Sequence, residues 1–137
     1  MGRIVAVDFG LKRLGVALSD ETKIIASSLK TLIAGKNSEE TAKLLLQLLQ
    51  EYSIDKIIFG NPLHMNGSVS FLADEVRHFI SIFEKMINIP ISLWDERLTS
   101  VQAHRTMQLG GVSRKNRAKK VDALAAIILL QSYLDSQ

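Results

Sequence analysis

The sequence predicts an α/β protein with a mixed five-stranded sheet flanked by helices. Its 137 residues contain five short runs rich in apolar and β-branched residues, which are typical of strands. Short turns separate the first three runs, whereas segments with the apolar spacing of helices precede the fourth and the fifth. Because short turns join antiparallel strands and helical crossovers join parallel strands, three antiparallel strands should be followed by two parallel βα units.

The first three strands are expected to form an antiparallel meander. They are expected at residues 3–9, 14–19 and 24–32. A turn containing Gly10 separates the first two strands, and the polar segment 20–23 separates the second from the third. Because both connections are short, each strand should pair with the next one along the chain.

Helices and strands alternate in the rest of the chain. The segment 37–40 has the spacing of a capping box and begins a helix that is expected to end near Tyr52. Ser68 or Ser70 can cap a second helix, whose apolar period extends to Ile87. The remaining expected elements are strands at 56–59 and 89–94, a helix from Thr99 or Ser100 to Leu109, a basic loop at 110–117 and a final helix at 119–134.

Length and composition indicate a single domain, residues 1–137, with 47% hydrophobic residues for its core. The absence of cysteine excludes disulfides and thiolate metal sites. The longest strongly apolar stretch, 121–130, is about half of a membrane-spanning length. The N-terminus leads directly into a strand pattern and leaves no room for a signal peptide. We therefore expect a soluble, cytoplasmic protein that does not bind membranes.

Positive charge is concentrated in one segment, although the net charge is only +3. Five cations and no acid fall within seven positions: Arg114, Lys115, Arg117, Lys119 and Lys120. Such clustering favours a phosphate backbone over small acidic metabolites. A solvated surface loop explains the same charges, and charge alone does not separate the two interpretations.

Three carboxylates that are distant in the sequence are expected at one end of the sheet. Asp8 ends the first apolar run, Glu96 follows the fifth, and Asp122 lies where the basic segment becomes an apolar helix. Carboxylates 4 Å apart repel by roughly 4 kcal/mol per pair at an effective dielectric near 20, and bound divalent cations offset this repulsion. If the three meet, they predict a Mg²⁺-dependent phosphoryl-transfer site.

Each carboxylate also has a structural interpretation. Asp8 could form an Asx-turn at the first hairpin, and Glu96 could favour the positive end of the following helix. Asp122 could be a helix-start acid that Lys119 or Lys120 compensates. The set of three at one rim is therefore stronger evidence than any single member.

Other candidate motifs favour structural roles. The segment 60–62 is interpreted as ordinary punctuation after the fourth strand. Trp94, Phe79 and Phe83 fit core positions better than base-stacking platforms. The histidines lack metal-ligand spacing and are interpreted as surface residues: His64, His78 and His104. The sequence contains no Walker-type loop, Ser/His/Asp arrangement or zinc pattern.

Four motifs, in order, resemble the YqgF-type family of Holliday-junction-resolvase homologues, also described as pre-16S rRNA processing nucleases. The resemblance covers essentially the whole chain. The motifs are 8–20, 60–68, 95–100 and 119–126. Two positions depart from the family: Asn61 replaces a residue that is more often apolar, and Ser100 replaces the usual Thr.

The resemblance implies an RNase H-like fold and a metal-dependent endonuclease. It implies Asp8, Glu96 and Asp122 as the acidic triad that holds Mg²⁺ or Mn²⁺, with two ions expected. Lys120 is expected to neutralise charge that develops on the phosphate. The residues expected to hold the nucleic-acid backbone are Lys12, Arg13, Arg97, Arg114, Lys115, Arg117 and Lys119.

The implied substrate is the 5′ end of precursor 16S rRNA, with a branched DNA junction as the alternative. Paired incision of a junction usually needs a symmetric dimer, so either a monomer or a homodimer is compatible with the sequence. A catalytically silent nucleic-acid-binding factor for ribosome assembly is a second alternative. A third is an actin-like ATPase or sugar kinase, since Asp8, Gly10 and Gly15 resemble their first phosphate loop, but one lobe cannot enclose a nucleotide.

Overall fold

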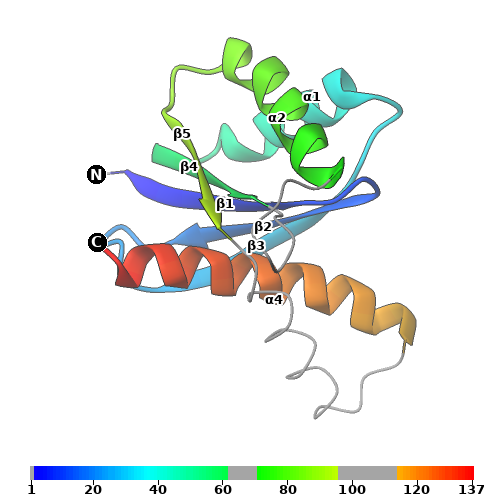
Figure 1. Ribbon diagram of the computed structural model, residues 1–137. Coiled ribbons are helices and arrows are strands. Elements are labelled where there is room, and N and C mark those ends of the chain that lie inside the picture. Colours follow the sequence, from blue (N-terminus) through cyan, green and yellow to red (C-terminus); the bar gives the residue numbers. More distant parts are fainter. Residues whose placement is uncertain (1, 62–70, 96–113) are drawn as a thin grey trace.

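The protein consists of one mixed sheet with helices on both faces (Figure 1). The computed structural model describes residues 2–61, 71–95 and 114–137, and for residues 95 and 114–122 it describes the backbone alone. The elements are β1 (Arg3–Phe9), β2 (Arg13–Ser19), β3 (Ala26–Ile33), α1 (Ser38–Leu49), β4 (Ile54–Asn61), α2 (Phe71–Phe83), the 3₁₀ helix η1 (Glu84–Met86), β5 (Ile91–Asp95) and α4 (Arg114–Asp135). The strand order is β3-β2-β1-β4-β5, which confirms the mixed five-stranded sheet.

The predicted antiparallel meander is confirmed. Val7 pairs with Val16 between β1 and β2, and β2 pairs with β3 in the same antiparallel sense. The third strand begins two residues later than expected, because the Asp20 carboxylate accepts hydrogen bonds from the amides of Ile24 and Ile25, at 2.9 and 3.0 Å. These two amides therefore belong to a turn.

The parallel half of the sheet is also confirmed. β4 pairs in parallel with both neighbours, so that Phe59 lies between Val7 of β1 and Leu93 of β5. The fourth strand, expected to end at Phe59, is longer than predicted, since Gly60 and Asn61 also pair with β5. β4 consequently extends to the same rim of the sheet as the end of β5.

The predicted helix starts and ends are only partly correct. The Asn37 side chain accepts a hydrogen bond from the Glu40 amide at 2.8 Å and caps α1, as expected. The second helix was wrongly extended to Ile87: α2 ends at Phe83, and Ile87 has an extended backbone although it still packs on the core. Its predicted caps, Ser68 and Ser70, and the helix expected at 99–109 lie outside the described residues.

The basic loop expected at 110–117 is wrong from Arg114 onward. α4 begins at Arg114, five residues before the expected start. Between 114 and 120 the sequence consists of Arg, Lys, Ala and Asn without Gly or Pro, and most of these are good helix formers. Five of the predicted phosphate-binding cations therefore lie on a helix.

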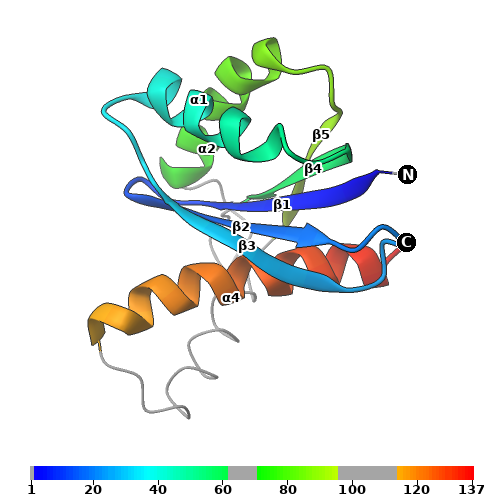
Figure 2. The same ribbon diagram turned by 180° about the vertical axis from the view of Figure 1, so that it is seen from behind.

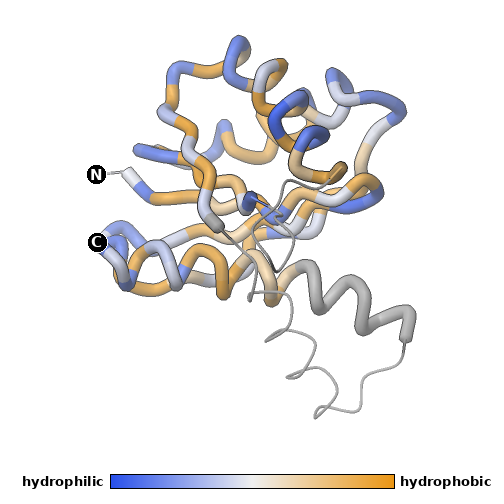
Figure 3. The backbone as a smooth tube through the Cα atoms, viewed as in Figure 1, coloured by the Kyte–Doolittle hydropathy of each residue, from blue (hydrophilic) through white to orange (hydrophobic). Residues whose placement is uncertain are grey.

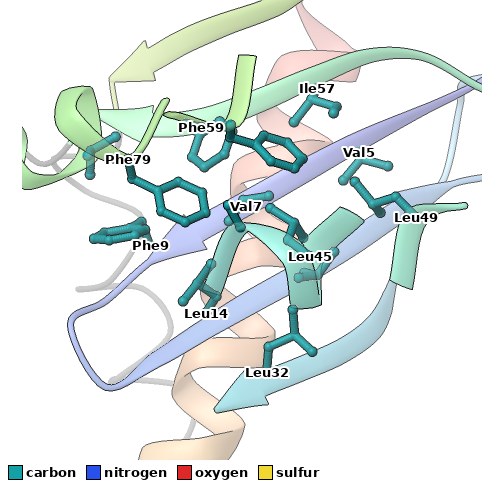
Figure 4. Packing of buried hydrophobic residues seen from close by; sticks show 14 of the residues in the cluster. Val5, Val7, Phe9, Leu14, Leu32, Leu45, Leu49, Ile57, Phe59 and Phe79 are labelled. Carbon is teal, nitrogen blue, oxygen red and sulfur yellow. The ribbon is translucent and has the colours of Figure 1, made fainter. Parts of the chain in front are cut away.

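A hydrophobic core lies on each face of the sheet. Val5, Val7 and Phe9 point to the face that α1 and α2 cover, where Phe9 and Phe79 have ring centroids 5.1 Å apart (Figure 4). Ile4 and Ala6 point to the opposite face and pack in one cluster with residues of α4. Figure 2 shows α1 and α2 on one side of the sheet and α4 on the other. Hydrophobic segments run through the strands and the adjoining sides of the helices (Figure 3).

Core positions agree with the sequence interpretation. Phe79 and Phe83 are fully buried, and Trp94 packs edge-on against Tyr133 with centroids 5.3 Å apart. His78 is exposed, as expected, whereas His64 and His104 lie outside the described residues. Within the described part of the chain, no helix has the length and hydrophobicity needed to cross a membrane.

Candidate active site

Asp8 lies near the end of the central strand β1 and belongs to the α4 face of the sheet. Side chains alternate between the two faces of a strand, and Ile4 and Ala6, which precede Asp8 at intervals of two, both pack under α4. Asp8 is half-buried and pairs across β1 and β2 with Gly15. The only predicted triad member with a described side chain is thus at the expected rim of the sheet.

The turn after β1 is tight, and Gly10 makes it possible. A Cβ atom at Gly10 would lie 2.7 Å from the carbonyl oxygen of Arg13, closer than a real Cβ approaches a backbone atom. Only glycine, which has no Cβ, allows the backbone to pass this close to another carbonyl group. The turn holds the predicted phosphate-binding residues Lys12 and Arg13 at the rim that Asp8 occupies.

α4 runs diagonally across the sheet, with its C-terminal part over the starts of β3 and β4. Tyr133 accepts a hydrogen bond from Lys56, near the start of β4, at 3.0 Å. Gln131 accepts one from the amide of Ala26, the first residue of β3, also at 3.0 Å. The N-terminal part of α4, which contains Asp122, therefore extends towards the rim where β1 ends (Figure 1).

The other predicted site residues are described only in part or not at all. Glu96 and Arg97 lie outside the described residues. Seven predicted basic residues have a described backbone position or side chain: Lys12 and Arg13 at the first turn, and Arg114, Lys115, Arg117, Lys119 and Lys120 in α4. Asp122 is likewise a position of α4 whose side chain is not described. A meeting of the three carboxylates stays a prediction.

Two carboxylates at the opposite end of the sheet have structural partners. Hydrogen bonds from the Thr22 hydroxyl and from the amides of Ile25 and Ile24 lower the pKa of Asp20 to about 2. A hydrogen bond from the Lys23 ammonium, at 2.6 Å, lowers the pKa of Asp55. Among the described side chains, no three Asp, Glu or His residues are close enough to hold a metal ion.

Sequence reasoning missed an exposed aromatic residue at the Asp8 rim. A hollow of about 410 Å³ opens between the first turn and the start of α2, and we call it the rim hollow. Its described lining residues are Gly10, Leu11, Lys12, Arg13, Phe71 and Leu72. Phe71 is 69% exposed. The sequence did indicate that Phe71 is exposed. Residues one and two helical turns after Phe71 lie on the same side of α2, and these are the polar residues Glu75 and His78, so Phe71 falls outside the apolar stripe.

Comparisons with known proteins agree with the fold. Residues 2–136 match the RuvX family, described as Holliday junction resolvase. A "Putative pre-16S rRNA nuclease" of Protochlamydia amoebophila is 48% identical, over 98% of this chain and 94% of the relative.

Two solved resolvases have a similar fold at low sequence identity. The Fowlpox virus Holliday junction resolvase matches with a TM-score of 0.62 and 18% identity, over 98% of this chain and 99% of its own. RuvC of T. thermophilus, solved with a Holliday junction substrate, matches with a TM-score of 0.59 and 13% identity, over 99% and 95% of the two chains. The expected RNase H-like, resolvase-type fold is confirmed, and the chain belongs to the RuvX family.

Proposed function

We propose that this protein is a metal-dependent endonuclease that cleaves precursor 16S rRNA during maturation of its 5′ end. The observation that supports it most directly is Asp8, half-buried at the end of the central strand on the face that α4 covers. The names of its relatives support the same substrate: proteins from Protochlamydia amoebophila and Bacillus subtilis, 48% and 41% identical, both have the name "Putative pre-16S rRNA nuclease".

Chain geometry supports an approach of Asp122 to Asp8. Ile4 and Tyr133 belong to one core cluster, which provides a common starting point. From Ile4 to Asp8 the strand advances about 13 Å. From Tyr133 back to Asp122 the helix covers about 16 Å in the same general direction. Asp122 also precedes the buried Ala126 by four positions, which is about one helical turn. Both lengths support the proposal that the two acidic positions share one rim.

The donor chemistry fits a hard divalent cation. Carboxylate oxygens are the ligands that Mg²⁺ and Mn²⁺ prefer, and Asp8 provides one in a half-buried position. Glu96 directly follows the last residue of β5, which pairs with the end of β4. We propose that Asp8, Glu96 and Asp122 hold Mg²⁺ or Mn²⁺. When bound, two such ions would activate water for attack and stabilise the departing oxygen of the phosphodiester.

The basic residues would bind and orient the substrate. Lys120 precedes Asp122 by two positions and would neutralise charge that develops on the scissile phosphate. Lys12 and Arg13 would hold the backbone at the end of β1. The remaining proposed backbone contacts are Arg97, Arg114, Lys115, Arg117 and Lys119. Such contacts do not depend on sequence, so affinity should fall steeply with salt.

A second candidate function is resolution of branched DNA. The observation that favours it is the match of residues 2–136 to a family described as Holliday junction resolvase. Paired cuts at a junction would require two active sites in a symmetric dimer, whereas a single cut in rRNA requires one. The two substrates therefore predict different active forms, a homodimer for branched DNA and a monomer or a homodimer for rRNA.

The test compares cleavage of a precursor 16S rRNA fragment and of a four-way DNA junction by the purified full chain, with and without Mn²⁺. We expect Mn²⁺-dependent cleavage of the RNA, reduced by a factor of about 10² or more in Asp8→Asn. Asp55→Asn, which removes a carboxylate at the opposite end of the sheet, is the matched control and should cleave normally.

Each other outcome has a defined meaning. Cleavage of the junction alone would favour the resolvase function. Failure to cleave either substrate would favour the assembly factor, and undiminished cleavage by Asp8→Asn would contradict the proposed site.

A further inference from the structure

The rim hollow has walls of two kinds. Leu11 and Phe71 supply apolar surface and are 57% and 69% exposed, so neither side chain contributes much to the core. Lys12 and Arg13 supply positive charge, and no acidic residue is among the described lining residues. An exposed aromatic ring beside two cations is suited to a ligand with a flat apolar part and a negative part.

We propose that the rim hollow binds an unpaired nucleotide of the substrate RNA, with its base on Phe71 and its phosphate near Lys12 and Arg13. This inference rests on the proposed function, because it names the part of that substrate which the protein recognises. Base stacking on aromatic rings is tolerant of sequence, since every base has a π-face. The hollow should therefore recognise strandedness and not a particular base.

The size of the hollow and the exposure of its aromatic ring favour an unpaired nucleotide over a duplex. Its volume of about 410 Å³ lies in the range of small-ligand pockets, which is large enough for a single nucleotide. A base within a duplex has both faces covered by its neighbours, so it cannot stack on a protein side chain. Single-stranded loops and ends expose bases for such contacts.

The position of the hollow relates it to the proposed cleavage site. Gly10 follows Asp8 by two residues, which is about 7 Å along an extended chain. Asp8 belongs to the α4 face of the sheet, whereas the rim hollow lies between the first turn and α2 on the other face (Figure 1). A strand bound at both places would cross the rim of the sheet next to Gly10. The nucleotide in the hollow would then be a close neighbour of the scissile phosphate.

The test measures binding without cleavage. Fluorescence anisotropy of a labelled RNA gives the Kd in EDTA, for an unpaired oligonucleotide and for the same sequence within a blunt duplex. Phe71→Ala should weaken binding of the unpaired RNA by roughly 5- to 100-fold and leave duplex binding unchanged. Phe71→Trp should retain binding of the unpaired RNA, because it restores an aromatic face.

Two further variants separate stacking from charge and from general surface effects. Ile24→Ala is the matched control, because Ile24 is also a large exposed apolar residue, 63% exposed, but lies at the opposite end of the sheet. It should bind both RNAs as the wild type does. Lys12→Gln should reduce the salt dependence for unpaired RNA by about 0.7 in log–log slope, as expected for one lost phosphate contact.

Two results would overturn the inference: an unchanged Kd for unpaired RNA in Phe71→Ala, or an equal loss for duplex RNA. The outcome is separable from that of the proposed function. Mn²⁺-dependent cleavage with an unchanged Kd in Phe71→Ala would refute the rim hollow and leave the nuclease intact. The expected loss of binding in a protein that cleaves nothing would support the hollow and refute the nuclease.

Discussion

The two faces of the sheet differ in the size of the side chains that cover them. The face under α1 and α2 is packed with large buried rings, including Phe59 and Phe79 (Figure 4). Phe83 joins them, and the centroids of these three rings are 5.9–6.4 Å apart. The cluster on the α4 face contains no phenylalanine among its described residues and includes three fully buried alanines, Ala6, Ala17 and Ala126, beside larger aliphatic residues. Short side chains allow a helix to lie close to the sheet. We infer that the first face mainly provides stability, whereas the second brings the helix that carries Asp122 towards Asp8.

The largest expected effect on stability is a truncation in the aromatic core. Phe79 is fully buried between Phe9, Phe59 and Phe83, so Phe79→Ala should lower the free energy of unfolding by about 3–5 kcal/mol. Urea denaturation measures the change. Phe71→Ala, an exposed residue of the same helix, is the control and should change it by less than about 0.5 kcal/mol. Equal effects of the two variants would contradict the assignment of the core.

Overpacking of the α4 face should affect activity more than overpacking of the other face. Ala126→Leu should cost about 1–3 kcal/mol of stability and should push α4 away from β1. Ala42→Leu on α1 is the matched change in the aromatic core, at a similar cost. Cleavage per folded molecule should fall for Ala126→Leu only. If both variants cleave equally well, the close approach of α4 is not needed for the reaction.

A smaller effect is expected from the contact that fixes the C-terminal part of α4. Lys56 donates a hydrogen bond of 3.0 Å to the Tyr133 hydroxyl and lies 5.1 Å from the centroid of its ring. Tyr133→Phe removes the hydroxyl but keeps the ring, so it should lower the free energy of unfolding by about 0.5–1.5 kcal/mol. Urea denaturation again measures it. No change in Tyr133→Phe would show that water replaces the hydroxyl without cost.

The smallest expected effect is a pH dependence at the end of the sheet away from Asp8. The folded-state pKa of Asp20, about 2, is below its ordinary value of 3.8. A depressed pKa stabilises the folded state above the ordinary value, and this contribution is lost as the pH falls from about 4 towards 2. Asp55, whose pKa is also lowered, acts in the same direction. Asp20→Asn should therefore flatten the loss of stability in acid, as measured by urea midpoints across this pH range.

The strands could be predicted from the sequence because local patterns determine them. Runs of β-branched residues and short turns specified five strands and the antiparallel pairing of the first three, and Asn37 specified the start of α1. The start of β3 was predicted wrongly because a single side chain changes the backbone there. The Asp20 carboxylate holds the amides of Ile24 and Ile25 and delays β3, although neither residue disturbs the apolar pattern.

For the candidate site, the sequence predicted only the type of residue, a carboxylate, and the rim of the sheet where it lies. The alternation of β1 gives the face of Asp8, because Ile4 and Ala6 lie on the same side of the strand. The rim hollow depends on the meeting of the first turn with α2, two segments about 60 positions apart. No local sequence pattern predicts that the first turn and α2 lie close together. From the sequence alone, Phe71 could be identified only as an apolar residue outside the apolar stripe of α2.

The central claim is that Asp8 and Asp122 hold a divalent cation together. Calorimetric titration of Mn²⁺ into the wild type, Asp8→Asn, Asp122→Asn and the control Asp55→Asn tests it directly. We expect saturable binding in the wild type and in Asp55→Asn, and affinity at least about tenfold lower in each of the other two variants. Mn²⁺ affinities that are the same in all four proteins, or a wild type without saturable binding, would contradict the claim.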